Sequence, residues 1–453
     1  MHFGRGSAWL CVIGLGLVTS CIADSADDGA QPSSQLTMDR VADGEIATAA
    51  ACTNPGGKRC FAHIQMAAQP LDAPAGFGPA DLQAAYAIPT ALAGHPTIGL
   101  IDAYGYDALE SDLATYRAQF GLPPCTTANG CLKIINQNGD TSPLPGPPPS
   151  GDDWTLETAL DVDMASAACP SCNLLVVQAD DDKGDGLEVG QGVAAQAGAA
   201  VISNSWGGPE QAGVSLSGEE TYFDQPVAVF VAAGDNGYDD GGQGPDYPGT
   251  SAHTIAVGGT HLVKDSSARG WTETAWSSGG SACSLSIAKP SYQANTSCNF
   301  KATADIAAVG DPQTGMASYD SANGGWSVVG GTSAAAPLVA AIFAATGNGS
   351  QTSGSFIMEN ANKLNDVTAG NNGDCGGGVL CNAGQGWDGP TGYGTPNGKL
   401  LVGNGASPDG QPDPYGVVSG GCNADAGPAS WLELVLAIGL VIGLAPSRRR
   451  VRG

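Results

Sequence analysis

The sharpest local motif of the sequence is GGTSAAAPLVAAIFAA, residues 330–345. Small side chains follow Ser333 at most positions, so a helix formed here can pack centrally against several neighbours. The two glycines before Thr332 permit a tight entry into this helix. A serine in the first turn lies beside unpaired backbone N–H groups and the positive end of the helix dipole, which suits a nucleophile whose attack creates an oxyanion. An ordinary N-cap serine on a buried helix is the alternative.

Short apolar runs before this helix alternate with Ala-rich stretches. They occupy residues 97–101, 173–178, 200–203, 227–232 and 254–257. Continuous hydrophobic strands separated by helices predict an α/β fold, a doubly wound and mostly parallel sheet with helices on both faces. In such sheets the ligand site lies beyond the carboxyl ends of the strands. The third run ends in NSWG at 204–207 and the fourth in AGDNG at 233–237, so we expect the chemistry in these loops.

A serine nucleophile needs a base, and the histidines offer no obvious one. They are His2, His63, His95, His253 and His261, and none lies in a His-Gly setting. Asp102, at the end of the first apolar run, has no histidine partner in the sequence and is interpreted as inert or structural.

A pair of carboxylates is the other candidate base. Residues 154–168 predict a helix with an apolar stripe, capped by Asp152 or Asp153. Glu157 and Asp161 are four residues apart on it, so both project from one face. Carboxylates this close titrate as a pair that can hold and pass one proton. A solvated acidic face is the alternative for such a pair in a chain this acidic.

Taken together, the motifs resemble those of the sedolisin family, serine-carboxyl peptidases with a subtilisin-like fold. In chain order they are ETALD at 157–161, SNSWG at 203–207, AGDNG at 233–237, TETAWSSGG at 272–280, KPSYQ at 289–293, ADIAAVGDP at 304–312 and GTSA at 331–334. The resemblance covers roughly residues 82–399 and implies that Ser333 attacks the scissile carbonyl, Glu157 takes its proton and Asp161 orients Glu157.

The resemblance also implies an oxyanion site and a substrate edge. Asp235 takes the oxyanion position, where it can help only as a protonated hydrogen-bond donor. Because the Glu157/Asp161 pair must keep a negative charge at the same time, we expect activity to be favoured at acidic pH. Ser205, Trp206 and Gly207 are expected to hydrogen-bond an extended substrate backbone.

A calcium site is the third implication. The family pattern gives one Ca²⁺ ion, held by the side chains of Asp366 and Asp388 and by the carbonyls of Val367, Gly384 and Gly386. Carboxylate and backbone oxygens are the ligands that calcium takes. Without the resemblance, a Gly-rich surface loop would be the better interpretation. Nothing in the sequence indicates an organic cofactor.

Charge and cysteine usage indicate an exported protein. The 44 acidic against 17 basic residues leave no basic surface for nucleic acid. Ten cysteines form close pairs typical of small disulfide loops outside the cell. These pairs are Cys52/Cys60, Cys125/Cys131, Cys169/Cys172, Cys283/Cys298 and Cys375/Cys381, and Cys11, Cys21 and Cys422 remain. The Cys169–Cys172 spacing also fits a redox motif, but no thioredoxin-like surroundings accompany it.

The two ends look like targeting segments around one peptidase domain. The organisation predicted is a signal peptide at 1–21, a linker or short pro-segment at 22–61, the peptidase domain at 62–403, a linker at 404–430 and an apolar segment with an Arg cluster at 431–453. The signal is either of lipoprotein type, with Cys21 lipidated, or for plain secretion. The last segment resembles the C-terminal sorting tails of myxobacterial surface proteins; a packed helix is the alternative. Localisation is therefore secreted or cell-surface.

The expected function is a serine-carboxyl endopeptidase acting on protein or peptide substrates as a monomer, with membrane contact only through the terminal segments. Its N-terminal segment is much shorter than the prodomain sedolisins usually carry, so it is either a reduced remnant or unnecessary for folding. The rivals are a catalytically silent calcium-binding surface protein on the same fold, a subtilisin-type peptidase and a calcium-dependent adhesin. The filled catalytic positions argue against the first and third, and the missing histidine against the second.

Overall fold

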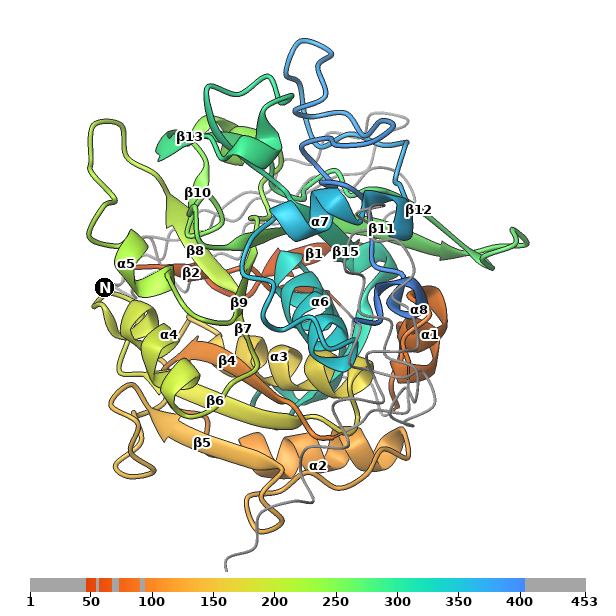
Figure 1. Ribbon diagram of the computed structural model, residues 1–453. Helices are drawn as coiled ribbons and strands as arrows, with labels where there is room; N and C mark the ends of the chain where they lie inside the picture. The colour runs from red at the N-terminus through yellow and green to blue at the C-terminus, as the bar shows by residue number, and fades with distance from the viewer. Residues whose placement is uncertain (1–45, 54–56, 67–72, 90–93, 404–453) are drawn as a thin grey trace, which may run out of the picture. The chain divides into compact units, whose positions relative to one another are not determined.

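The computed structural model describes residues 46–53, 57–66, 73–89 and 94–403 (Figure 1). All of them belong to the first of two units into which the chain divides, Met1–Gly410. The predicted signal peptide, the linker at 404–430 and the segment at 431–453 lie outside the described residues. Within the described ranges, no helix has the length and apolar character needed to cross a bilayer.

The helices of this part of the chain surround a central sheet. They are α1 Pro79–Ala85, α2 Leu109–Gln119, α3 Trp154–Ala168, α4 Gly186–Gln196, α5 Glu220–Phe223, α6 Thr332–Ala345, α7 Ser355–Glu359 and α8 Gly398–Leu401. The strands are β1 Thr48–Ala50, β2 Arg59–Cys60, β3 His63–Gln65, β4 Thr97–Ala103, β5 Leu132–Asn136, β6 Asn173–Ala179, β7 Val201–Asn204, β8 Trp206–Pro209, β9 Ala228–Ala232, β10 Asp246–Tyr247, β11 Ile255–Lys264, β12 Trp271–Ala275, β13 Ala282–Ala288, β14 Phe300–Thr303, β15 Ile306–Val309, β16 Met316–Asp320 and β17 Gly325–Gly330.

The central sheet has eight strands in the order β12-β11-β9-β7-β4-β6-β5, with β15 also paired to β11. All pairings are parallel except that of β12, which folds back antiparallel on β11. The predicted mostly parallel α/β sheet is confirmed. The five predicted apolar runs correspond to β4, β6, β7, β9 and β11.

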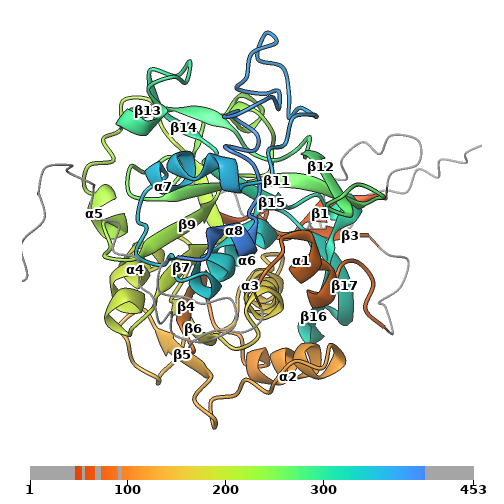
Figure 2. The same ribbon diagram turned by 45° about the vertical axis from the view of Figure 1, so that its right-hand side comes forward.

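Helices cover both faces of this sheet, and the two that carry chemistry share one face. α3 and α6 lie side by side (Figures 1 and 2). α4 packs on the opposite face, where a Cβ built on Gly190 would lie 2.7 Å from Ile101 of β4. Because neighbouring side chains of a strand alternate between faces, Asp102 points to the α3 side.

α3 spans the predicted residues, Trp154–Ala168, and begins and ends at the predicted cap and proline. Asp153 caps it, its side chain accepting a hydrogen bond from Leu156 N, and the chain leaves the helix at Cys169 just before Pro170. The helix differs from the prediction in being buried almost all round, including Glu157 and Asp161, which are both 0 % exposed. The solvated acidic face is therefore excluded.

α6 carries a proline inside its first two turns. Pro337 has no backbone N–H, so the carbonyl of Ser333 loses its helical partner. The Ser205 hydroxyl lies 3.2 Å from that carbonyl oxygen and can supply the missing donor. The nucleophile candidate is thus tied through its own backbone to the loop after β7.

The described part of the expected linker, residues 46–53 and 57–61, pairs with the peptidase body. β1 runs antiparallel to β3, β3 to β17, and β2 to β8. The sequence shows no apolar period here, but a strand added at a sheet edge is held by backbone hydrogen bonds, which need none. The boundary expected at residue 62 falls between β2 and β3.

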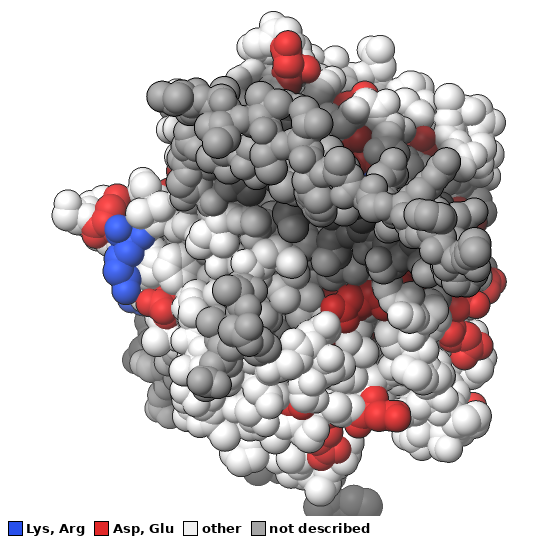
Figure 3. Space-filling model, turned by 180° about the vertical axis from the view of Figure 1, so that it is seen from behind, with Lys and Arg blue, Asp and Glu red and all other residues white. Residues whose placement is uncertain are grey.

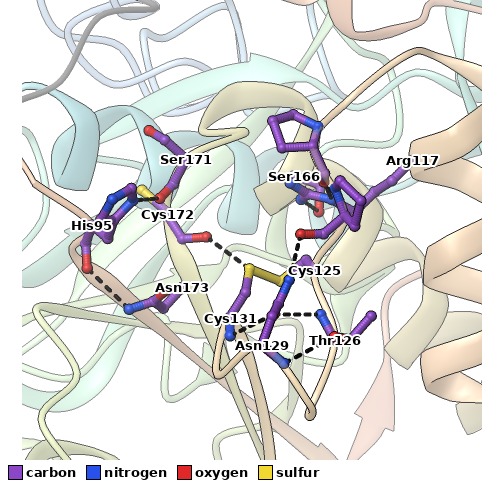
Figure 4. The surroundings of a disulfide bond; sticks show 12 residues. His95, Arg117, Cys125, Thr126, Asn129, Cys131, Ser166, Ser171, Cys172 and Asn173 are labelled. Atoms are coloured by element: carbon purple, nitrogen blue, oxygen red, sulfur yellow. Dashed lines mark hydrogen bonds between the residues drawn. A yellow bond between two sulfur atoms is a disulfide. The ribbon is translucent and has the colours of Figure 1, made fainter.

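The five predicted disulfides are all present. Figure 4 shows Cys125–Cys131, which closes a turn ordered by Asn129: its side-chain oxygen accepts from the backbone N of Thr126 and of Cys131. On the face in Figure 3, acidic side chains occur at several separate places and basic ones at one edge.

Candidate active site

Ser333 lies in the first turn of α6 and is fully buried. Gly331 enters this turn at φ 105°, a left-handed conformation that favours glycine. The Ser333 hydroxyl has two acceptors within reach, Glu157 Oε2 at 2.9 Å and the backbone oxygen of Ser205 at 3.0 Å. The fold therefore brings the predicted nucleophile and the predicted base, 176 residues apart in the chain, into hydrogen-bond contact.

Glu157 Oε2 contacts a second donor, the backbone N of Ala62, at 3.0 Å. One carboxylate oxygen thus lies between a serine hydroxyl and a peptide nitrogen. A base in this position can take a proton from the first and deliver it to the second without moving.

The proton count around Asp161 indicates that its carboxyl is protonated. The Ser205 hydroxyl has one hydrogen but two contacts, Asp161 Oδ1 at 2.6 Å and the Ser333 carbonyl at 3.2 Å. Both are satisfied at once only if Asp161 donates to Ser205 while Ser205 donates to Ser333. Ser205 accordingly does more than its predicted substrate contact: its side chain joins Asp161 to the nucleophile's backbone.

Asp102, expected from the sequence to be inert or structural, interacts electrostatically with Glu157 and Asp161. It is 0 % exposed, and among the described residues neither of its oxygens has a hydrogen-bond partner, nor do Glu157 Oε1 and Asp161 Oδ2. Burial raises its pKa to about 7. The signal was its place at the carboxyl end of β4, the sheet edge where functional groups gather.

Burial and mutual repulsion set the charge of this cluster. Burial, then the charge of Asp102, raises the pKa of Glu157 and of Asp161 well above the ordinary carboxyl range, and Asp235 and Glu157 respectively add to the effect. Groups coupled in this way lose their protons in steps that belong to the cluster. The cluster therefore keeps at least one proton over a wide range of acidic pH.

Asp235 follows β9 and lies beside the first turn of α6. Its Oδ1 accepts from Thr332 N at 2.8 Å and Thr332 Oγ1 at 2.6 Å, while Oδ2 lies 3.5 Å from His63 Nε2. Burial raises its pKa to about 8, although Thr332 and Arg59 oppose the shift. A protonated Oδ2 is thus available as a donor at acidic and neutral pH.

The chain's own N-terminal segment fills the cleft above these residues. Cys60 pairs with Trp206 and Arg59 with Gly207, and Phe61 N donates to the Ser205 oxygen at 3.2 Å and to Ser333 Oγ at 3.0 Å. The predicted substrate edge 205–207 therefore binds an extended backbone. Trp206 contributes only its backbone there, since its side chain is buried and its Nε1 donates to the Ile101 oxygen at 3.0 Å.

The Phe61 carbonyl lies at the centre of this arrangement. Its two flanking nitrogens, of Phe61 and Ala62, contact Ser333 and Glu157. A Cβ built on Gly331 would lie 1.8 Å from the Phe61 oxygen and 2.7 Å from Asp235 Oδ2, so these two oxygens border the same small space. Any side chain at position 331 would close it.

The five predicted calcium ligands lie apart from the catalytic residues, on the loop that ends at 388. The Asp366 carboxylate accepts from Gly386 N at 3.1 Å, and the Asp388 carboxylate accepts from Gly384 N at 2.9 Å. Burial raises the pKa of Asp388 to about 7; hydrogen bonds from Gly384 and Thr391 oppose the shift, and the charge of Asp366 adds to it. Within the described ranges no three His, Cys, Asp or Glu side chains cluster as ligands. The two carboxylates on this Gly-rich loop are of the oxygen type that a hard cation takes.

We expect the protein to be more stable in acid than at neutrality. Buried carboxyls with raised pKa values, Asp102, Glu157, Asp161, Asp163 and Asp235, hold protons in the folded state that the unfolded chain releases near pH 4. Their contribution is complete below about pH 4 and is lost as pH rises through the folded pKa values, about 7 for Asp102 and about 8 for Asp235.

Calorimetry of the Ser333→Ala variant, chosen so that self-digestion cannot interfere, should show the melting temperature falling by on the order of 10 °C from acidic to mildly alkaline pH. A melting temperature that is flat or rises over this range would contradict the expectation.

Comparison with known proteins gives concordant matches. The model of the subtilase family matches residues 152–384. Kumamolisin from Bacillus sp. (strain MN-32) is 31% identical over 365 residues, 73% of this chain and 64% of the relative. Sedolisin from Pseudomonas sp. (strain 101) is 29% identical over 342 residues, 67% of this chain and 56% of the relative. The chain thus spans less than two thirds of both relatives.

A solved structure agrees in fold. Pseudomonas sedolisin, a serine-carboxyl proteinase complexed with two molecules of pseudo-iodotyrostatin, superimposes with a TM-score of 0.61 at 25% identity, covering 73% of this chain and 98% of that one. The chain belongs to the subtilase family and, within it, to the sedolisin group of serine peptidases.

Proposed function

We propose that this protein is an exported serine-carboxyl endopeptidase that hydrolyses peptide bonds with Ser333 as nucleophile and Glu157 as general base. The observation that carries the proposal is the position of Glu157 Oε2, 2.9 Å from the Ser333 hydroxyl and 3.0 Å from the nitrogen of a peptide lying in the cleft. A solvated acidic pair or a structural N-cap serine requires neither contact.

The reaction follows from these contacts. Ser333 Oγ attacks the carbonyl carbon of a peptide bound along residues 205–207, and its proton passes to Glu157. The same Glu157 oxygen then protonates the leaving nitrogen, and water hydrolyses the acyl-enzyme with the proton moving in the reverse direction. The Ser205 hydroxyl contacts both Asp161 Oδ1 and the Ser333 carbonyl oxygen, so Asp161 is linked through it to the backbone of the nucleophile.

Asp235 would stabilise the oxyanion. Its Oδ2 borders the space occupied by the Phe61 carbonyl oxygen, and its raised pKa keeps it neutral. An ionised carboxylate there would repel the developing charge. Because release of the N-terminal segment admits water and lowers this pKa toward the ordinary range, we expect free enzyme to work best on the acid side of neutrality.

One calcium ion at Asp366, Val367, Gly384, Gly386 and Asp388 would hold the loop at residues 384–388 and play no part in the proton transfers. When bound, the ion would neutralise the two carboxylates.

We expect chelation of calcium to lower the melting temperature by several degrees, since a ligand at a hundred times its Kd stabilises by about 2.7 kcal/mol. An Asp366→Asn, Asp388→Asn double variant should start at the lower value and not respond to the chelator. Equal responses of wild type and variant would place the ion elsewhere.

The function is tested by hydrolysis of an unfolded protein and a fluorogenic peptide from acidic to mildly alkaline pH. Wild type, Ser333→Ala and Glu157→Gln are compared with calcium present, and loss of the N-terminal segment is followed by mass. Cleavage by wild type that both variants lose supports the proposal. Equal cleavage by all three proteins would contradict the proposal. So would the absence of cleavage by folded wild type that has lost its segment, and that result would favour a silent binding protein.

A further inference from the structure

Residues 46–53 and 57–65 are held on both sides of the catalytic centre, and Phe61 and Ala62 contact it. Before the Phe61–Ala62 bond, β2 pairs with β8. After it, β3 pairs with β17 at Ile64–Val329 and His63–Gly330. The chain that leads in, β1, lies on β3, with Ala51 N donating to the Ala62 oxygen at 2.8 Å. The bond is therefore presented to Ser333 like that of a bound peptide substrate.

The cations next to this bond strengthen the docking. Lys58 Nζ lies 2.8 Å from Glu188, and Arg59 Nη2 lies 2.6 Å from Asp240 and 3.1 Å from Asp246. These carboxylates are nearly buried, so the pairs are screened less than surface ion pairs. The chain has only 17 Lys and Arg, and two adjacent ones here form ion pairs with three carboxylates. These pairs indicate that the segment binds specifically in the cleft.

We propose that Phe61–Ala62 is this peptidase's own first cleavage site, and that the Cys52–Cys60 disulfide keeps the cut segment in the cleft until a thiol reduces it. The inference rests on the proposed function. Ser333 Oγ bonds to the Phe61 carbonyl carbon, the Phe61–Ala62 C–N bond breaks, and Glu157 delivers the serine proton to the Ala62 nitrogen. Water then frees the Phe61 carboxylate and returns the proton to Ser333.

The cut alone does not open the site. The new Ala62 amine starts β3, which stays paired with β17. The residues before the cut remain held twice, by β2 on β8 and by β1 on β3. Cys52, two residues after β1, is bonded to Cys60 inside β2, so the disulfide couples these two holds directly. Both holds belong to the same fragment, and the disulfide closes the loop between them, so the detached fragment has fewer conformations and the Phe61 end re-binds at high effective concentration.

Reduction leaves the two holds joined by the backbone alone, so each can detach more independently of the other. A small dithiol is oxidised as the Cys52–Cys60 bond becomes two thiols, and both cysteines line one pocket beside the cleft through which a small molecule can approach. A ring of this size restricts the freed chain enough that opening it should raise the rate on an external peptide by about 10- to 100-fold.

The test uses the full chain, purified oxidised with calcium. N-terminal sequencing and mass report the cut, size-exclusion chromatography reports whether the fragment ending at Phe61 stays bound, and a fluorogenic peptide reports open sites. Wild type is compared with Cys52→Ser, Cys60→Ser and, as the matched control, Cys125→Ser, Cys131→Ser, which opens another short disulfide loop. If the first variant does not fold, thiol titration of wild type with mass mapping of the opened disulfide replaces it.

We expect oxidised wild type and the control to be cut after Phe61, to retain the fragment and to act slowly. The Cys52/Cys60 variant, or wild type once that disulfide is open, should lose the fragment and act faster. Full activity of oxidised wild type, or loss of the fragment with the disulfide intact, would overturn the inference and leave the proposed function standing. Loss of the fragment after reduction with no hydrolysis of any bond would overturn both.

Discussion

Replacing Ser333 with alanine should lower kcat/KM for peptide hydrolysis by on the order of a million-fold, the loss seen when a serine nucleophile is removed from a complete site. The hydroxyl is the only group in the cleft placed to attack while in contact with Glu157 Oε2 at 2.9 Å, among the residues that the structure describes. Steady-state kinetics on a fluorogenic peptide, with enzyme freed from its N-terminal segment, measures the effect.

Ser355→Ala is the matched control, because Ser355 also starts a helix, α7, and among the described residues it has no hydrogen bond to a catalytic residue. It should keep wild-type rates. A Ser333→Ala protein that retained a hundredth or more of the activity would show that another group attacks, and the catalytic assignment would then be wrong.

The second large effect is expected at Asp235, where two substitutions separate charge from hydrogen bonding. Asp235→Ala removes the donor and should lower kcat by about 10²- to 10³-fold. Asp235→Asn keeps a donor that cannot ionise, so it should be more active than Asp235→Ala. Its rate should also lack the fall that the wild type shows when rising pH ionises Asp235.

The pH profile is the readout that a purely structural role would not change. The charged or titratable groups around Asp235 are His63, at 3.5 Å, and Arg59, Asp246 and Glu157, which act through their charge. None of these is altered by the asparagine. If the Asn variant keeps the alkaline decline of the wild type, the decline belongs to another group and Asp235 is not the oxyanion donor.

Much of the fold can be predicted from the sequence, because the local sequence patterns favour the same strands and helices that the tertiary structure contains. The continuous apolar runs became the inner parallel strands, and the cap at Asp153 and the stop at Pro170 gave the bounds of α3. The sequence gives weaker signals for two other strands of the central sheet: β5 contains a lysine at 133, and β15 is only four residues long. Edge and short strands depend on their neighbours more than on their own composition.

The sequence predicts which residues form the site much better than it predicts which of them contact one another. Glu157 and Asp161 share a helix face, which spacing alone reveals. The electrostatic coupling of Asp102 to that pair depends on how β4 and α3 pack, which no local sequence pattern indicates. The docking of residues 46–53 and 57–61 was hidden for another reason: strand addition uses backbone groups, and the sequence of a strand held that way is free to look like a linker.

The pairing of β2 with β8 has a consequence for handling the protein. While β2 is in place, β8 has a neighbour on each side, β10 and β2. Departure of β2 turns β8 into an open edge whose N–H and C=O groups are templates for another chain. The same edge that receives substrates will then recruit partly unfolded copies of the enzyme, so activated preparations should aggregate at concentrations that latent ones tolerate. The N-terminal segment would thus keep the protein soluble as well as block the cleft. The oxidised, uncleaved chain is therefore the form to concentrate and store.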